Sequence, residues 1–274
     1  MIEIHANLKN LKAKLIIILC LWQSSISAQI LFTDTLELSN EITAFSQDRN
    51  GNFFLAFKGG TITKYSDSQD SLLSFSPSKL GDVTNIEAWH GFKIFAFYQE
   101  FQDYTIFDRY LSRAVRTPLS QSSINYIDVA TYSRDQKIWA VEENGLRLLK
   151  INLILREIEI DIPLEFILSN KDYNFCFIKE YQNLVFLIDK ISGIYIFDNL
   201  GNYLRKIDAP GISHCSFKND ELYFIQDYHL HIVGLYKNEE LIIKLPIAEY
   251  TGVIVTKNTL ILVTKNKLYG LLLK

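Results

Sequence analysis

The sequence predicts an all-β protein, a six-bladed β-propeller whose ring is closed by pairing of the N-terminal strand with the last blade. Three observations predict this fold. Strand-like segments recur about every 41 residues, turn residues separate them, and one strand is left over at the N-terminal end of the repeats. No segment of useful length shows helical periodicity.

The repeat is visible in six segments that can be superimposed, each with a polar turn followed by an apolar strand. They begin at Asn52, Phe92, Gln136, Asn183, Asp220 and Asn258, so successive starts lie 40, 44, 47, 37 and 38 residues apart. A period near 40 residues with only strands inside it is typical of propellers. Residues 29–274 therefore make six blades, because seven blades would leave only about 35 residues for each.

Each period contains four strands, seen most clearly in the first one at 42–47, 52–57, 61–65 and 71–75. The last period ends with its third strand at 267–272 and so lacks an outer strand. We expect the spare apolar strand at 29–38 to fill that place, since pairing there covers an open sheet edge.

The chain resembles the six-bladed β-propellers of the NHL and TolB-like kind. The resemblance rests on the turn at 48–52, on the hairpin sequence at 195–201 and on the period, and it covers nearly all of residues 29–274. It implies the architecture, and it suggests that metal-dependent lactonase-like hydrolysis is an alternative function.

The first 28 residues have the features of a cleaved secretory signal peptide. Three lysines precede an unbroken apolar run at 15–22, and a short polar stretch ends in small residues at Ala28. A membrane-spanning helix needs about 20 apolar residues, and this run has eight. We therefore expect two parts, a signal peptide at 1–28 and one propeller domain at 29–274, with the mature protein periplasmic or secreted.

The charge of the chain excludes a strongly basic nucleic-acid-binding protein. Lysine and arginine total 28 against 31 aspartates and glutamates, a net charge of -3. Without residues 1–28 the balance is 25 basic to 30 acidic residues. We expect no nucleic acid, no membrane span in the mature chain and no cofactor, and we expect the partner to be an envelope protein or a small ligand.

The loops that join second to third strands and outer to inner strands form one face of a propeller, where ligands usually dock. These loops are acidic and rich in tyrosine. The candidate binding residues are Tyr98, Phe101, Asp103, Glu142, Glu143, Asp189, Asp227, Tyr228 and Tyr250.

A candidate metal site consists of Asp227, His229 and His231. These residues alternate along an expected strand, which would place their side chains on one face. No catalytic set is assigned, since the sequence has no Gly-x-Ser-x-Gly motif and no spacing that demands a catalytic triad.

Cys176 and Cys215 align on the inner strands of adjacent blades. An oxidising compartment allows a disulfide between them. Two buried free thiols are the alternative that we favour, because free cysteine is among the most buried residue types.

Large side chains occupy one shared position of the second strand in all six blades, which predicts that they fill the space between neighbouring sheets. They are Leu55, Phe95, Trp139, Phe186, Tyr223 and Ile261. A surface for stacking sugars would instead need aromatic side chains exposed together on loops. Tyr98, Phe101 and Tyr104 form the one such cluster.

These features predict an exported, non-catalytic binding or scaffolding propeller of the cell envelope that presents a loop face to a protein or ligand. A metal-dependent hydrolase and a glycan-binding surface protein are the two alternatives.

Overall fold

The structure is a computed structural model that describes residues 32, 34–112, 114–119, 124–168, 172–237, 239–246 and 249–272. The predicted signal peptide at 1–28 lies outside these residues. Within the described residues, no helix is long and apolar enough to cross a membrane.

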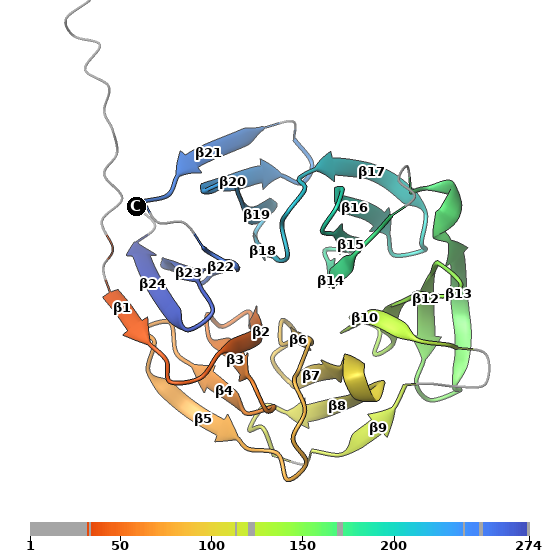
Figure 1. Ribbon diagram of the computed structural model, residues 1–274, viewed down its shortest axis with the longest axis horizontal. Coiled ribbons are helices and arrows are strands. Elements are labelled where there is room, and N and C mark those ends of the chain that lie inside the picture. Colours follow the sequence, from red (N-terminus) through yellow and green to blue (C-terminus); the bar gives the residue numbers. More distant parts are fainter. Residues whose placement is uncertain are drawn as a thin grey trace, which may run out of the picture. The chain divides into compact units, whose positions relative to one another are not determined.

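The described residues form six four-stranded antiparallel sheets, and Figure 1 shows them arranged as a ring of blades. This confirms the predicted all-β, six-bladed propeller. In Figure 1 the first strand of each blade lies nearest the centre of the ring, so the inner strands β2, β6, β10, β14, β18 and β22 surround the ring axis, which we call the channel.

The strands follow the chain blade by blade, from the inner strand outward. The first two blades contain β2 (Ile42–Gln47), β3 (Phe53–Phe57), β4 (Ile62–Tyr65), β5 (Ser71–Phe75), β6 (Asn85–Glu87), β7 (Lys93–Tyr98), β8 (Asp103–Asp108) and β9 (Arg116–Pro118). The third and fourth contain β10 (Ile127–Tyr132), β11 (Ile138–Glu142), β12 (Arg147–Asn152), β13 (Glu157–Pro163), β14 (Phe175–Tyr181), β15 (Leu184–Asp189), β16 (Gly193–Asp198) and β17 (Tyr203–Asp208).

The fifth blade contains β18 (Cys215–Lys218), β19 (Glu221–Gln226), β20 (His229–Gly234) and β21 (Glu240–Lys244). The sixth begins with β22 (Gly252–Val255), β23 (Thr259–Val263) and β24 (Lys267–Leu272). Two single turns of 3-10 helix, η1 (Gln99–Phe101) and η2 (Leu164–Phe166), lie in the connecting loops.

The N-terminal strand β1 (Asp34–Glu37) completes the sixth blade. It pairs antiparallel with β24, with Leu36 opposite Leu268, and it takes the place of the missing outer strand. The predicted closure is thereby confirmed, and a strand from one end of the chain covers an edge that would otherwise be open.

The second strands supply the core between the blades, as the superimposed segments predict. The shared position is buried in every blade, with Tyr223 the most exposed of the six at 4%. Phe186 of the fourth blade, for example, packs against Phe217 of the fifth, with 4.5 Å between ring centroids. Each large side chain buried in this way contributes about 1.5 to 3 kcal/mol, so these contacts hold neighbouring sheets together.

A buried ion pair crosses the middle of the channel. Lys179 Nζ of β14 lies 2.6 Å from Glu87 Oε2 of β6, and both side chains are buried. The other Glu87 oxygen accepts the backbone N–H of Trp89 at 2.6 Å. Because each charge has a partner, the pair is tolerated inside the protein.

Two amide side chains join further inner strands beside this ion pair. Gln47 of β2 donates to the carbonyl of Phe217 and accepts the N–H of Val255, each at 2.8 Å. Asn85 of β6 donates to the carbonyl of Ala130 at 2.8 Å. These polar side chains therefore link inner strands of different blades to one another.

Candidate functional site

The candidate site is the mouth of the channel on the face formed by the second-to-third-strand loops and the outer-to-inner-strand loops. Backbone hydrogen bonds tie the two kinds of loop together, such as Leu119 N–H to Gln102 O at 2.8 Å and Lys190 N–H to Asn174 O at 2.9 Å. The blades therefore hold these loops in fixed positions around the channel.

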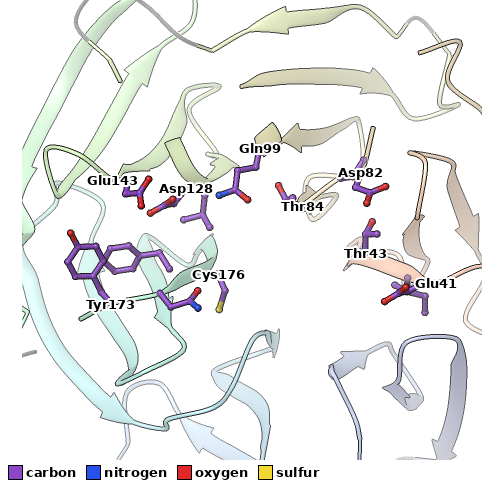
Figure 2. Close-up of a pocket in the computed structure, with 14 residues that line it drawn as sticks. Glu41, Thr43, Asp82, Thr84, Gln99, Asp128, Glu143, Tyr173 and Cys176 are labelled. Atoms are coloured by element: carbon purple, nitrogen blue, oxygen red, sulfur yellow. The ribbon is translucent and has the colours of Figure 1, made fainter. Parts of the chain in front are cut away.

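A cavity of about 620 Å³ opens at this mouth, a volume within the range of small-ligand sites. Figure 2 shows its polar side chains facing a common space. The lining residues are Glu41, Ile42, Thr43, Asp82, Val83, Thr84, Gln99, Asp128, Val129, Glu143, Tyr173, Asn174, Phe175 and Cys176. Four of these fourteen side chains are carboxylates, and none is lysine, arginine or histidine.

Three of the lining side chains stand at bulges in the inner strands. The pairing with the second strand skips Thr43 in β2, Asp128 in β10 and Cys176 in β14. A bulge breaks the alternation of side chains and redirects one of them. The same irregularity in three blades places one polar or thiol side chain from each in the channel mouth.

Asp128 and Glu143 form the most unusual part of the lining, and Figure 2 shows them side by side. Burial, together with the neighbouring charge of Glu143, raises the pKa of Asp128 to about 6. Among the described residues, no side chain donates a hydrogen bond to either carboxyl group and no cation pairs with it. A ligand that brings positive charge or hydrogen-bond donors would find both groups available.

The other two carboxylates, across the cavity in Figure 2, already have partners. Asp82 Oδ1 accepts the backbone N–H of Gly59 at 2.6 Å, which ties two loops together. Glu41 lies 3.5 Å from Lys265 Nζ in an exposed ion pair. They add to the negative potential of the cavity, but Asp128 and Glu143 are the groups left for a ligand.

An aromatic surface completes the lining. The rings of Tyr173 and Phe175 are stacked with centroids 5.3 Å apart, and both residues line the cavity. Aromatic faces attract cations as well as apolar groups. The cavity thus combines carboxylates with aromatic rings.

Of the candidate binding residues, Glu143 lies in the cavity, while Glu142 and Asp189 have structural roles beneath it. Glu142 is paired with Arg147 at 2.8 Å and accepts the N–H of Asn125 at 2.7 Å. Asp189 accepts the N–H of Asn174 at 2.7 Å. Each carboxylate ends a second strand and fixes the loop that leads into the inner strand of its own blade.

Two of the three aromatic side chains expected to be exposed are buried and the third, Phe101, is partly buried, which corrects the basis of the glycan-binding alternative. Tyr98 is 1% exposed and Tyr104 is 9% exposed. The Arg116 guanidinium lies 3.9 Å above the Tyr98 ring and also faces Phe101. Asp103 is a strand residue opposite Tyr98. The cluster belongs to the packing of the second blade, so it offers no open ring to a sugar.

The remaining candidates, Asp227, Tyr228 and Tyr250, lie outside the cavity. Asp227 and Tyr228 form a tight turn with φ of 46° and 65°, and Tyr228 is exposed. Tyr250 packs edge-on against Tyr269, with centroids 6.1 Å apart.

The proposed metal ligands do not share one strand face, because β20 begins only at His229 and Asp227 precedes it in the turn. His229 Nδ1 lies 2.7 Å from the carbonyl oxygen of Asp227. His231 Nδ1 lies 2.7 Å from Glu240, and its ring stacks on Phe224. In the described part of the chain, no group of three or more His, Cys, Asp or Glu side chains is placed to hold a metal ion.

Both cysteines are free thiols on adjacent inner strands, as the alignment predicts for their positions. Cys176 lines the cavity, and burial raises the pKa of its thiol to about 12. Cys215 is buried deeper, and burial likewise raises its pKa. Neither thiol is therefore an activated nucleophile.

His214, next to Cys215 in the chain, is buried between the rings of Phe45 and Phe177. Burial lowers its pKa to about 3. The imidazole is accordingly neutral and is a structural part of the core.

The sequence matches no protein-family model. No curated protein matches it either. Among solved structures, virginiamycin B lyase from Staphylococcus aureus is similar with 14% identity and a TM-score of 0.62, over 88% of this chain and 99% of that one. A streptogramin B lyase is similar with 16% identity and a TM-score of 0.62, over 88% and 97%.

The Cps50 (Swd1) β-propeller domain of Myceliophteria thermophila is similar with 12% identity and a TM-score of 0.67, over 89% of this chain and 100% of that one. The likeness is one of fold. At these identities it does not transfer a site or an activity, and the resemblance to NHL and TolB-like propellers holds at the level of architecture.

Proposed function

We propose that the protein is a non-catalytic binding module of the cell envelope that takes a positively charged ligand or peptide segment into the cavity at the channel mouth. The observation that supports this is the lining itself, with four carboxylates and no basic side chain among fourteen residues. Two of the carboxylates, Asp128 and Glu143, have no hydrogen bond or ion pair among the described residues.

The chemistry of the lining favours a cation over other ligands. A carboxyl group that is hard to ionise because of a neighbouring carboxylate becomes easier to ionise when a cation binds beside it. The partly buried ring of Tyr173, which stacks on the buried Phe175, offers a surface for the aliphatic part of a lysine or arginine side chain. The rigid ring of blades keeps the ordering cost of binding low.

The envelope location is part of the proposal and depends on the sequence at 1–28. The positive start, the eight-residue apolar run and the small residues before position 29 support export. Expression of the full chain, followed by cell fractionation and N-terminal sequencing of the mature protein, tests this directly. We expect the mature chain in the periplasm or medium, beginning at Gln29.

The binding proposal is tested by calorimetric titration of the mature protein with trilysine, and with triglutamate as the oppositely charged probe. We expect binding of trilysine alone. The double variant D128N/E143Q should lose at least about tenfold in affinity, because it removes both available charges from the cavity.

The matched control is E157Q/E165Q, which removes two exposed glutamates outside the cavity. It should bind trilysine as the wild type does. An equal loss of trilysine affinity in both double variants would show that binding depends only on the overall charge of the protein. Absence of trilysine binding to the wild type would overturn the proposal.

A second candidate function is acid–base catalysis at the same cavity, and the raised pKa of Asp128 is the observation that favours it. A carboxyl group that titrates near neutral pH beside an ionised neighbour is a common arrangement in enzymes. Two proteins of similar fold are named lyases, virginiamycin B lyase and a streptogramin B lyase. Consumption of virginiamycin B, followed by chromatography and abolished by D128N, would establish this candidate against the binding module.

A further inference from the structure

A second cavity, of about 250 Å³, lies at the opposite end of the channel. Its lining residues are Arg49, Trp89, His90, Arg134, Glu180, Tyr181, Gln182 and Asn183. The inner strands lead from one cavity to the other. In β14, Cys176 lines the first cavity, whereas Glu180 and Tyr181 line the second, about 13 Å further along the strand.

The second cavity has the opposite charge. It contains two guanidinium groups and one carboxylate, and neither Arg49 nor Arg134 has an ion-pair partner within 4.0 Å among the described residues. The carboxylate of Glu180 is engaged elsewhere. It accepts the indole N–H of Trp139 at 2.8 Å and the backbone N–H of Arg134 at 3.2 Å.

Local structure holds both arginines at the cavity. Arg49 stands in the turn after β2, where Asp48 Oδ1 accepts the backbone N–H groups of Asn50 at 2.8 Å and Asn52 at 3.0 Å. Its guanidinium lies 5.6 Å from the ring centre of Trp89. Arg134 follows β10, and the hydrogen bond from its backbone to Glu180 fixes its position.

His90 lies close to both arginines. Burial lowers the pKa of its imidazole, Glu87 opposes this, and the charges of Arg49, Lys179 and Arg134 lower it further. The imidazole is therefore neutral at physiological pH and has one N–H to donate. The lining of the cavity therefore includes two guanidinium groups and one imidazole that can donate hydrogen bonds to a ligand.

We propose that this cavity is a binding site for a small tetrahedral oxyanion, a phosphate or sulfate group, held by Arg49 and Arg134 with His90 as a further hydrogen-bond donor. Guanidinium groups bind such anions through paired, charge-assisted hydrogen bonds. The volume is below that of most drug-sized sites, which fits a single charged group. The group can be a free anion or the head group of an anionic lipid.

The test is a titration of the mature protein with inorganic phosphate, read by calorimetry and by tryptophan fluorescence, to which the cavity residue Trp89 contributes. A flotation assay on phosphatidylglycerol and phosphatidylcholine vesicles is run in parallel. The variant R49Q/R134Q removes both charges. R156Q is the control, because Arg156 is an exposed arginine on the hairpin between β12 and β13, outside the cavity.

Phosphate binding that falls at least tenfold in R49Q/R134Q and is unchanged in R156Q supports the site with a free anion as its ligand. Flotation with phosphatidylglycerol vesicles alone, lost in the same double variant, supports the site with a lipid head group. Binding that survives R49Q/R134Q, or no binding of either probe, overturns the proposal. An unchanged melting temperature in R49Q/R134Q establishes that the variant is folded.

Discussion

At Asp128, the local backbone structure of the channel mouth changes the pKa of a side chain. The bulge in β10 turns its carboxyl group into a partly buried space beside Glu143, and burial then raises its pKa to about 6. Neither the bulge nor the neighbour can be recognised from the residue types around position 128.

The raised pKa of Asp128 predicts a specific dependence of stability on pH. Because its folded pKa lies above the unfolded value near 3.9, the folded state binds the proton more tightly, and this residue's contribution is favourable at low pH. That contribution is lost as pH rises from about 4 to about 6. Solvent screening at this partly open site limits it to about 1 kcal/mol.

The measurement is the free energy of unfolding of wild type and D128N by urea between pH 4 and pH 7. The free energy of unfolding of D128N, relative to that of the wild type, should increase as pH rises through 6. A difference that does not vary with pH would contradict the pKa assigned to Asp128.

The buried pair of Glu87 and Lys179 gives a second prediction at this scale. K179M leaves the Glu87 carboxylate buried without its cation, which should lower the free energy of unfolding by about 3 to 5 kcal/mol. The double variant E87Q/K179M should recover much of this loss, since the glutamine oxygen still accepts the N–H of Trp89. Urea unfolding of the three proteins is the measurement, and equal losses in K179M and E87Q/K179M would contradict the assigned role of the charge.

At the scale of elements, the strands were predictable because their signals are local. Alternating apolar residues and turn residues gave the first blade at nearly the observed bounds, and the shared second-strand position is buried throughout. The cavity residues were not predictable in the same way. Thr43, Asp128 and Cys176 line it because bulges interrupt the alternation on which sequence patterns depend.

The roles of the candidate residues in the loops could not be predicted from sequence patterns either. Glu142 and Asp189 looked like surface acids, but each ends a second strand and accepts a backbone N–H from the adjoining loop. Only their partners distinguish such residues from Glu143, one position along the chain from Glu142. Hydrogen-bond and ion-pair partners depend on contacts between blades and loops, so they cannot be predicted from a single segment of sequence.

The start of β16 gives a prediction about an element. Gly193 has a φ of 120°, and an added Cβ would lie 2.2 Å from the carbonyl oxygen of Ile207 in the neighbouring strand β17. G193A should therefore lower the free energy of unfolding by about 3 kcal/mol or more. Gly211 also has a positive φ, of 87°, but an added Cβ there meets nothing within 4 Å.

G211A is thus the control, because it introduces backbone strain without a steric clash. We expect it to lower the free energy of unfolding by about 1 kcal/mol. Chemical denaturation of both variants provides the comparison. Similar costs for the two variants would show that β16 and β17 are not packed as closely as described.

At the scale of the whole molecule, closure of the ring depends on β1. Removing residues 1–37 would expose the edge of β24 and remove the side chain of Leu36 from the core, so we expect a loss of about 3 kcal/mol and a tendency to aggregate. Removing residues 1–31 leaves β1 in place and should not change stability. Thermal unfolding and light scattering of both truncated chains test this, and equal stability would contradict closure by β1.

The two ends of the channel differ in charge because carboxylates lie at the beginnings of β2, β6 and β10, whereas arginines follow the ends of β2 and β10. Along the inner strands, Glu87 and Lys179 lie between the residues that line one cavity and those that line the other. This difference in charge is the basis of both proposals, a cationic ligand at one end of the channel and an anion at the other.

The most direct test of two oppositely charged binding sites is a nuclear magnetic resonance titration of residues 29–274 with trilysine and, separately, with phosphate. Trilysine should shift the amide resonances of Thr43, Thr84 and Asp128, and phosphate those of Arg49, His90 and Arg134. If trilysine does not shift the resonances of the channel mouth, or if both probes shift the same set of resonances, the claim of two separate sites is contradicted.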